Sequence, residues 1–146
     1  MIAGPIFTIG YEQATVADVV GALTKAGVKR VIDVRAVAAS RRPGFSKTAL
    51  AANLNEAGIA YEHLRALGTP KEGREAARKG DLAALERVYA GQLELPEAQA
   101  QAAIMLDRAA AEPVAILCYE RDPAECHRTL LLDAVAAEVA RVDLYA

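Results

Sequence analysis

The stretch AILCYERDPAECHRTLLL, from Ala115 to Leu132, decides the fold of this chain. The apolar run from Pro113 to Cys118 is typical of a buried strand, and the alanine- and leucine-rich run from Thr129 to Val139 is typical of a helix. The short turn between them holds two cysteines, a histidine, two arginines and three acids. In open α/β sheets, ligands bind where strands end and the next helices begin. We therefore expect this turn to be part of a site.

The same alternation of strand and helix continues on both sides of this stretch. Further strands are predicted at Ile6–Gly10, Val28–Val34, Ile59–Leu64 and Val142–Tyr145; helices are predicted from Thr15 to Gly27, from Ser46 to Gly58, and at Leu82–Tyr89 and Glu97–Ala110; a loop is predicted at Gly68–Gly73. This pattern predicts one α/β domain over residues 1–146. Its mainly parallel sheet of about five strands would carry helices on both faces, in a Rossmann-like three-layer architecture.

Composition narrows the classes of function. Hydrophobic residues make up 53% of the 146 residues, as in a globular protein. The net charge of −2, the 5% aromatic content and the absence of tryptophan disfavour nucleic acid as a partner, without excluding it. No apolar run is long enough to cross a membrane, and no secretory segment begins the chain. We expect a cytoplasmic protein without a membrane partner; the sequence does not indicate an oligomeric state.

Residues able to do chemistry gather where the predicted strands end. The first strand leads into Gly10 and Tyr11, the second into Asp33 and Arg35, and the strand before the cysteine turn into Cys118. Because the carboxyl ends of parallel strands share one edge of a sheet, we expect these residues to lie close together.

Asp33 and Arg35 lie two residues apart and so share one face of their strand. One interpretation is a structural ion pair in which Arg35 neutralises a buried Asp33. The other is that Arg35 binds a phosphate or carboxylate bidentately while Asp33 orients it. The basic loop that follows contains Ser40 and Arg41, and it favours an anion site.

The turn after Cys118 offers a candidate nucleophile. Asp122 before a proline predicts a helix N-cap, which would place Cys126 and His127 in the second turn of that helix, with Arg128 next to them. Nearby unpaired N–H groups would lower the pKa of the Cys126 thiol and make it reactive. The alternative is an inert buried cysteine that faces the sheet.

Proton transfer to or from Cys126 would fall to His127 or Glu120. Adjacent residues on a helix point about 100° apart, so Glu120 and His63 compete with His127 for this role. Seven residues separate Cys118 from Cys126, which is not zinc-site spacing, and we predict no metal and no cofactor. A disulfide between the two cysteines is sterically conceivable across the turn.

Several of these segments, in this order, resemble the domain of unknown function 488 family: Thr8–Tyr11, Val31–Arg35, Ser40–Arg42, Phe45–Lys47, Gly58–Leu64 and Cys118–Arg128. The resemblance covers nearly the whole chain and implies a compact α/β domain with no settled reaction. The positions it carries over are Gly10, Tyr11, Asp33, Arg35, Ser40, Arg41, Phe45, Cys118, Glu120, Cys126, His127 and Arg128. Where members often have small hydroxyl residues after the first strand, this chain has Glu12 and Gln13.

Two functions remain open at this point. The first is an enzyme that acts on a small phosphorylated or nucleotide-like molecule, held by Arg35, Arg41 and Arg128 and attacked by Cys126. The second is a module that binds a nucleotide or a nucleic-acid end without turnover. A third interpretation makes the cysteine turn purely structural.

Overall fold

The computed structural model describes residues 2 and 4–146 and contains one five-stranded sheet. The strand order is β3-β2-β4-β1-β5 and all neighbouring strands are parallel. The strands are β1 (Ile6–Gly10), β2 (Arg30–Asp33), β3 (Ala60–His63), β4 (Val114–Cys118) and β5 (Arg141–Tyr145). The helices are α1 (Val16–Ala26), α2 (Lys47–Glu56), α3 (Lys71–Arg78), α4 (Leu82–Leu93), α5 (Pro96–Ala111) and α6 (His127–Val135), with short 3₁₀ turns η1 (Arg65–Leu67) and η2 (Pro123–Glu125). The predicted three-layer α/β fold is confirmed.

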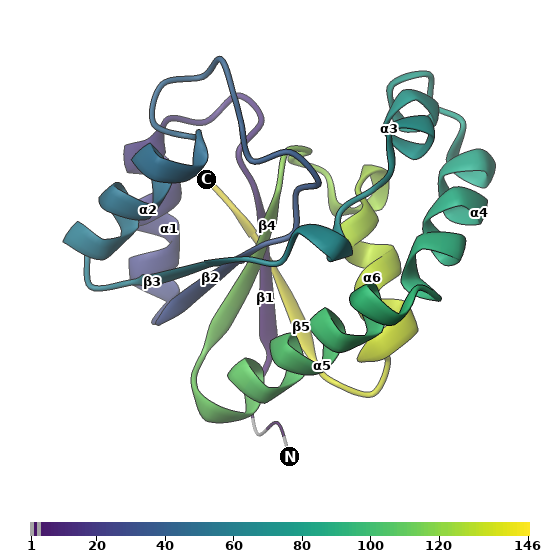
Figure 1. The fold of residues 1–146 in the computed structure, drawn as a ribbon. Helices are drawn as coiled ribbons and strands as arrows, with labels where there is room; N and C mark the ends of the chain where they lie inside the picture. The colour runs from purple at the N-terminus through teal and green to yellow at the C-terminus, as the bar shows by residue number, and fades with distance from the viewer. Residues whose placement is uncertain (1, 3) are drawn as a thin grey trace.

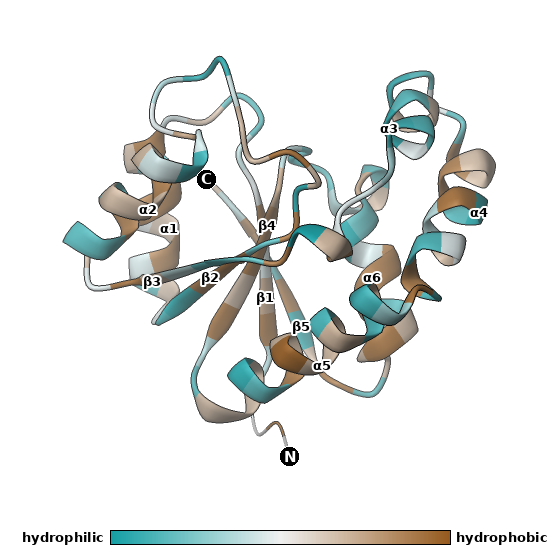
Figure 2. Ribbon diagram, in the orientation of Figure 1, coloured by the Kyte–Doolittle hydropathy of each residue, from teal (hydrophilic) through white to brown (hydrophobic). Residues whose placement is uncertain are grey.

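Helices cover both faces of the sheet, as Figure 1 shows. On one face, α1 and α2 pack through residues such as Leu23 and Leu54. On the other, α4, α5 and α6 pack through residues such as Tyr89, Met105 and Leu131. The apolar colouring of Figure 2 follows these two inner surfaces. All five residues of β4 are buried, as expected for a central parallel strand covered on both faces.

The structure differs from the sequence prediction at α3, because a loop was expected at Gly68–Gly73 and no element from there to Leu82. Gly73 lies within α3, although glycine weakens helix interiors. A Cβ on this glycine would lie 2.4 Å from the Cγ2 atom of Thr69, so the absence of a side chain is what lets α3 pack so closely on Thr69. Packing therefore outweighs helix propensity at this position.

The cysteine turn also differs in detail from its prediction. Asp122 does cap a turn, accepting a hydrogen bond from the backbone N–H of Ala124, but that turn is only the 3₁₀ segment η2. The α-helix starts afresh, with Cys126 in extended conformation as the N-cap of α6. Cys126 thus lies at a helix N-terminus and not in a second turn. The helix also ends at Val135, four residues before its predicted end.

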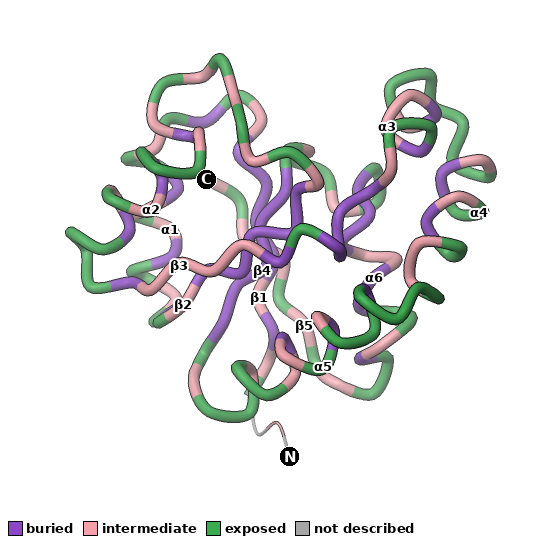
Figure 3. Tube along the Cα trace, viewed as in Figure 1, coloured by how far each residue is buried: buried purple, intermediate pink, exposed green. Residues whose placement is uncertain are grey.

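The three inner strands β1, β2 and β4 are mostly buried, as the tube in Figure 3 shows, whereas the edge strands β3 and β5 contain no buried residue. The carboxyl ends of the strands and the loops that follow them lie at one end of the sheet (Figure 1). No helix within the described residues is long and apolar enough to cross a membrane.

Candidate functional site

A cavity of about 420 Å³ opens at the carboxyl ends of β1, β2 and β4. This volume falls within the usual range for small-molecule sites. Its walls come from the loops after these strands and from α3, α4 and the start of α6. The lining residues whose side chains can bind or react are Tyr11, Glu12, Arg35, Thr69, Arg74, Arg78, Cys118, Tyr119, Glu120, Glu125 and His127. The cavity thus lies at the edge of the sheet where the sequence analysis expected a site.

Arg35 and Asp33 form a buried ion pair at the end of β2. The Nε and Nη2 atoms of Arg35 donate to the two carboxylate oxygens of Asp33 at 2.9 and 2.7 Å. Its Nη1 atom donates to the Tyr11 hydroxyl and to the Phe45 carbonyl, so four of its five N–H groups are occupied. Tyr61 also donates a hydrogen bond to Asp33.

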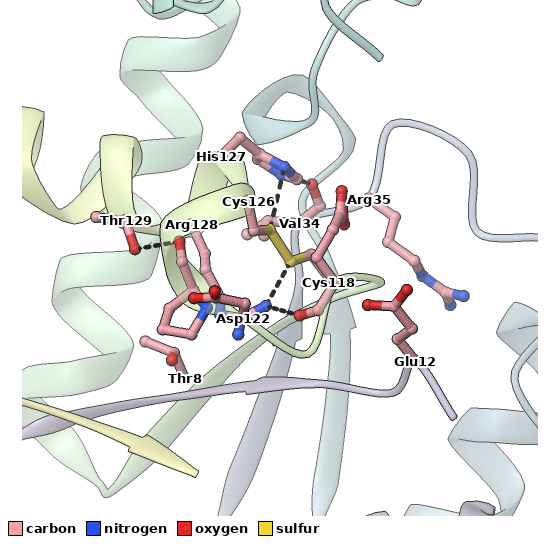
Figure 4. The surroundings of a disulfide bond; sticks show 12 residues. Thr8, Glu12, Val34, Arg35, Cys118, Asp122, Cys126, His127, Arg128 and Thr129 are labelled. Carbon is pink, nitrogen blue, oxygen red and sulfur yellow. Dashed lines mark hydrogen bonds between the residues drawn. A yellow bond between two sulfur atoms is a disulfide. The ribbon is translucent and has the colours of Figure 1, made fainter. Parts of the chain in front are cut away.

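This pairing keeps Arg35 charged. Burial opposes the charge, but the hydrogen bonds and attraction to Asp33 outweigh burial and raise the pKa of Arg35 above its ordinary value. Arg35 still lines the cavity, with one N–H group left for a ligand. Figure 4 shows its guanidinium turned away from the cysteines. The geometry is that of the structural pair, in which Asp33 occupies most of the guanidinium.

Ser40 and Arg41, which we expected to contact an anion, do not line the cavity. Ser40 is half-buried and organises its own loop, since its hydroxyl accepts from the backbone N–H of Arg42. The Arg41 side chain is exposed. The structure does not bring these two residues together with the cysteine turn.

Cys118 and Cys126 are joined by a disulfide. Both cysteines are buried, with exposures of 1% for Cys118 and 2% for Cys126. Cys118 ends β4 and lines the cavity, and Cys126 does not line it. The Nδ1 atom of His127 lies 3.7 Å from the Sγ atom of Cys126. The three residues form a group small enough for one ion, but sulfurs bonded to each other offer no thiolate to a metal.

His127 is buried and neutral. Its Nε2 atom lies 2.7 Å from the Val34 carbonyl oxygen, so this nitrogen carries the proton. Nδ1 is then unprotonated, and the Cys126 sulfur beside it has no proton to donate while it is in the disulfide. Burial lowers the pKa of His127 to about 4. The hydrogen bond between α6 and the end of β2 gives this residue a structural part in the fold.

Arg128 is completely buried beneath the turn and forms no salt bridge with any described residue. Its Nη1 atom lies 2.9 Å from the Sγ atom of Cys118, and the guanidinium also donates to the carbonyls of Glu120 and Arg121 (Figure 4). Its Nε atom has no hydrogen-bond partner among the described residues. Burial lowers the pKa of Arg128.

Gly10, at the end of β1, packs directly against the loop that follows β4. A Cβ at this position would stand 1.7 Å from the carbonyl oxygen of Glu120 and 2.9 Å from Nη1 of Arg128. Only glycine lets β1 approach the loop after β4 so closely. Gly10 does not line the cavity, so the structure assigns it to packing.

The charged lining of the cavity divides into two sides. Glu12, Glu120 and Glu125 come from the loops after β1 and β4, and burial raises the pKa of Glu120. Arg74 and Arg78 come from α3, and neither belongs to an ion pair with a described residue. The sequence analysis missed both arginines because it predicted no element between Gly73 and Leu82. Their four-residue spacing was the available signal, since it puts two side chains on one helix face.

Comparison with known proteins gives a family but no reaction. A family model described as "Domain of unknown function DUF488" matches residues 15–135, which is most of the chain. Neither curated proteins nor solved structures yield a match. The match agrees with the resemblance carried by the sequence motifs.

Proposed function

Because the chain belongs to the family described as "Domain of unknown function DUF488", which names no reaction, we propose a function from its cavity. The protein binds a small anionic molecule, of the phosphorylated or nucleotide-like class, at the carboxyl edge of the sheet. It acts on this molecule as an enzyme through the cysteine pair in reduced form. The observation that carries the proposal is the pair of unpaired arginines on α3, which face the cavity that Cys118 also lines.

Arg74 and Arg78 replace Arg35 and Arg41 as the main anion-binding residues. Arg74 is half-buried, and its Nη1 atom donates a hydrogen bond to the Thr69 carbonyl oxygen at 2.9 Å. This hydrogen bond fixes its guanidinium at the cavity wall. Arg78 is exposed one helical turn further on. Two guanidinium groups on one helix face can bind a phosphate or two carboxylates, and an anion would restore charge balance at this wall.

Glu120 is the proton-transfer group of the proposed enzyme. Burial favours its neutral carboxylic acid, which can donate a proton to a leaving group. His127 is unsuited to this role because its buried ring is neutral and its Nε2 proton is bonded to Val34. A cytoplasmic location belongs to the same proposal: in a reducing compartment the cysteine pair would be present as thiols.

A thermal-shift experiment tests the anion site. Wild type, Arg74→Ala and the matched control Arg41→Ala are melted with phosphate, sulfate, mononucleotides and short oligonucleotides. A ligand at 100 times its Kd stabilises the native state by about 2.7 kcal/mol, which raises the Tm by about 5–10 °C for a chain of this size. We expect a shift with one anion class that Arg74→Ala removes and Arg41→Ala retains. Equal shifts in both variants, or none in wild type, would contradict the proposal.

A non-catalytic binding module is the second candidate, and one observation favours it. Both cysteines are tied up in the disulfide, so no described cysteine is free to act as a nucleophile in this state. A ligand found by thermal shift is therefore incubated with reduced and with oxidised protein. Conversion only by the reduced protein supports the enzyme, and binding without conversion by either form supports the module.

A further inference from the structure

Arg128 poses an electrostatic problem that the anion site does not solve. Its guanidinium is completely buried and has only backbone carbonyls and one sulfur as partners. A buried cation without an anion is costly, and such charges are normally paired. The sulfur in contact with it, Sγ of Cys118, is neutral in the disulfide and becomes an anion when the disulfide is reduced to thiolate. Asp143, Glu120 and Asp122 attract Arg128 without forming a salt bridge with it, so reduction would supply the one anion in direct contact with the guanidinium among the described residues.

The two cysteines are not equivalent in position. Both cysteines are buried, but only Cys118 lines the cavity, and its sulfur also touches Arg128. Cys126 is the N-cap of α6 and does not line the cavity. An attacking thiolate at the cavity wall and a second thiol within bonding distance of it are the two parts that thiol–disulfide exchange requires.

We propose that this protein reduces small disulfides that carry carboxylates, with Cys118 as the attacking thiolate, Arg128 as its counterion and Cys126 as the resolving thiol. This reverses the sequence expectation, in which Cys126 was the nucleophile. The preference for carboxylates rests on the proposed anion site, because Arg74 and Arg78 would bind them; the exchange itself rests only on Cys118, Cys126 and Arg128.

The reaction balances over two steps. The Cys118 thiolate attacks one sulfur of the substrate R–S–S–R, forming a Cys118–S–S–R bond and releasing R–S⁻. The Cys126 thiol gives up its proton to solvent or to the released thiolate, and its sulfur attacks Sγ of Cys118, which forms the protein disulfide and releases the second R–S⁻. The substrate gains two electrons and the protein dithiol loses two. A second thiol, small or protein-borne, then reduces the protein disulfide by the same exchange.

The charges around Cys118 favour its thiolate on balance. Arg128 is the group in direct contact with the sulfur. The remaining charged residues that line the cavity are Glu12, Arg35, Arg74, Arg78, Glu120 and Glu125. Asp33 neutralises Arg35, while burial raises the pKa of Glu120 and Arg128 opposes that rise. Outside the lining, Asp122 in the turn and Asp143 in β5 also attract Arg128. The thiolate is favoured because Arg128 touches the sulfur directly, whereas these acids form no salt bridge with Arg128.

Trapping the intermediate tests which sulfur attacks. The reduced variants Cys126→Ser and Cys118→Ser are mixed with 5,5′-dithiobis(2-nitrobenzoate), a disulfide that carries carboxylates. Cys126→Ser should quickly release one equivalent of thionitrobenzoate. The second thionitrobenzoate should stay on Cys118 as a mixed disulfide, which mass spectrometry would detect. Cys118→Ser should react at least about tenfold more slowly. Reduced wild type should release two equivalents and retain none. Faster reaction of Cys118→Ser would overturn the proposal.

The role of Arg128 is tested in the Cys126→Ser background through the pH dependence of Cys118 alkylation by iodoacetamide. With Arg128 present, the midpoint should lie at least about one unit below the 8.5 of an ordinary thiol. Arg128→Lys should keep part of the shift and Arg128→Gln should lose it, whereas Arg42→Gln is the control at an arginine outside the cavity. If neither Arg128 variant folds, a midpoint near 8.5 in Cys126→Ser alone is enough to contradict the role of Arg128.

The substrate preference is tested separately. The rate with 5,5′-dithiobis(2-nitrobenzoate) is divided by the rate with uncharged 4,4′-dithiodipyridine, in Cys126→Ser with and without Arg74→Ala and Arg78→Ala. The ratio should fall several-fold in the arginine variants and stay constant in Arg41→Ala. If the ratio is unchanged and Cys118 is still trapped rapidly, the anion site is contradicted and the proposed exchange reaction stands. If trapping is slow but anions still raise the Tm of wild type and not of Arg74→Ala, the exchange reaction is contradicted and the anion site stands.

Discussion

Replacing Gly10 by alanine is expected to destabilise the protein and disturb the cysteine turn in one step. The new Cβ would stand 1.7 Å from the Glu120 carbonyl oxygen, a separation that real carbon–oxygen contacts do not reach. The loop after β4 would have to withdraw by roughly 1 Å or more, because the obstacle is backbone and cannot rotate away. The same Cβ would stand 2.9 Å from Nη1 of Arg128, whose contacts hold that loop.

The cost follows from this geometry. Overpacking a well-packed interior costs about 1–3 kcal/mol, and a backbone obstacle puts Gly10→Ala at or above the upper end. A loss of about 3 kcal/mol lowers the Tm of a chain of this length by about 6–12 °C. The assay is urea unfolding followed by circular dichroism, with the Tm as a second measure.

Gly21→Ala is the matched control. Gly21 lies within α1 and nothing comes within 4 Å of the position its Cβ would take, so alanine should stabilise that helix by about 0.5–1 kcal/mol. If Gly10→Ala stays within about 0.5 kcal/mol of wild type, the close approach does not constrain the fold. If Gly10→Ala is as stable as wild type but its Tm no longer rises with ligand, Gly10 has the binding role predicted from the sequence.

Three further changes have defined outcomes. Asp33→Asn leaves the buried Arg35 without its anion and should cost about 3–5 kcal/mol in urea unfolding; a loss under about 1 kcal/mol would show that the pair is dispensable. Burial lowers the pKa of His127 to about 4 in the folded protein, whereas the unfolded chain takes up this proton near pH 6.5. Stability should therefore fall as the pH drops from about 6.5 to 4, by up to about 3 kcal/mol, and His127→Gln should flatten the curve; an unchanged slope would contradict this cause. Thr15→Ala removes the N-cap hydrogen bond to the Asp18 N–H and should cost about 1 kcal/mol, and an unchanged urea midpoint would show that the cap is not needed.

The fold could be predicted from sequence because its strands are short apolar runs bounded by glycine, proline or polar residues. The run at β1 matched its predicted bounds, and the buried β4 was recognised within a residue. The prediction missed α3, because it ended a loop at Gly73 and assigned no element before Leu82. Gly73 is needed there because Thr69, four residues earlier, leaves no room for a Cβ, a contact that depends on how Thr69 is turned at the helix start.

The cavity lies where the sequence predicted a site, but only some of the predicted residues line it. Strand order and alternation bring Tyr11, Arg35 and Cys118 to one cavity, which general rules for parallel sheets foresee. They do not foresee that Asp33 would occupy most of the Arg35 guanidinium, since both the structural and the functional interpretation fit the same two letters. Nor do they indicate that Arg128 turns inward to Cys118, because that depends on where η2 ends and α6 begins.

The strand order determines how long a newly synthesised strand must wait for its neighbours in the sheet. β1 is made first, yet its two neighbours in the sheet are β4 and β5, and Thr8 pairs with Asp143, 135 residues later. At roughly 5–20 residues per second, β1 waits about 7–27 s on the ribosome before both of its edges can be covered. During that interval β2 and β3, which are connected by α2, can pair with each other. The edges of the apolar β1 remain unpaired and can form non-native contacts. Folding from full-length unfolded chain should therefore be slow for its size, because its central pairings are non-local, and nascent chains that stop before β4 should depend on chaperones.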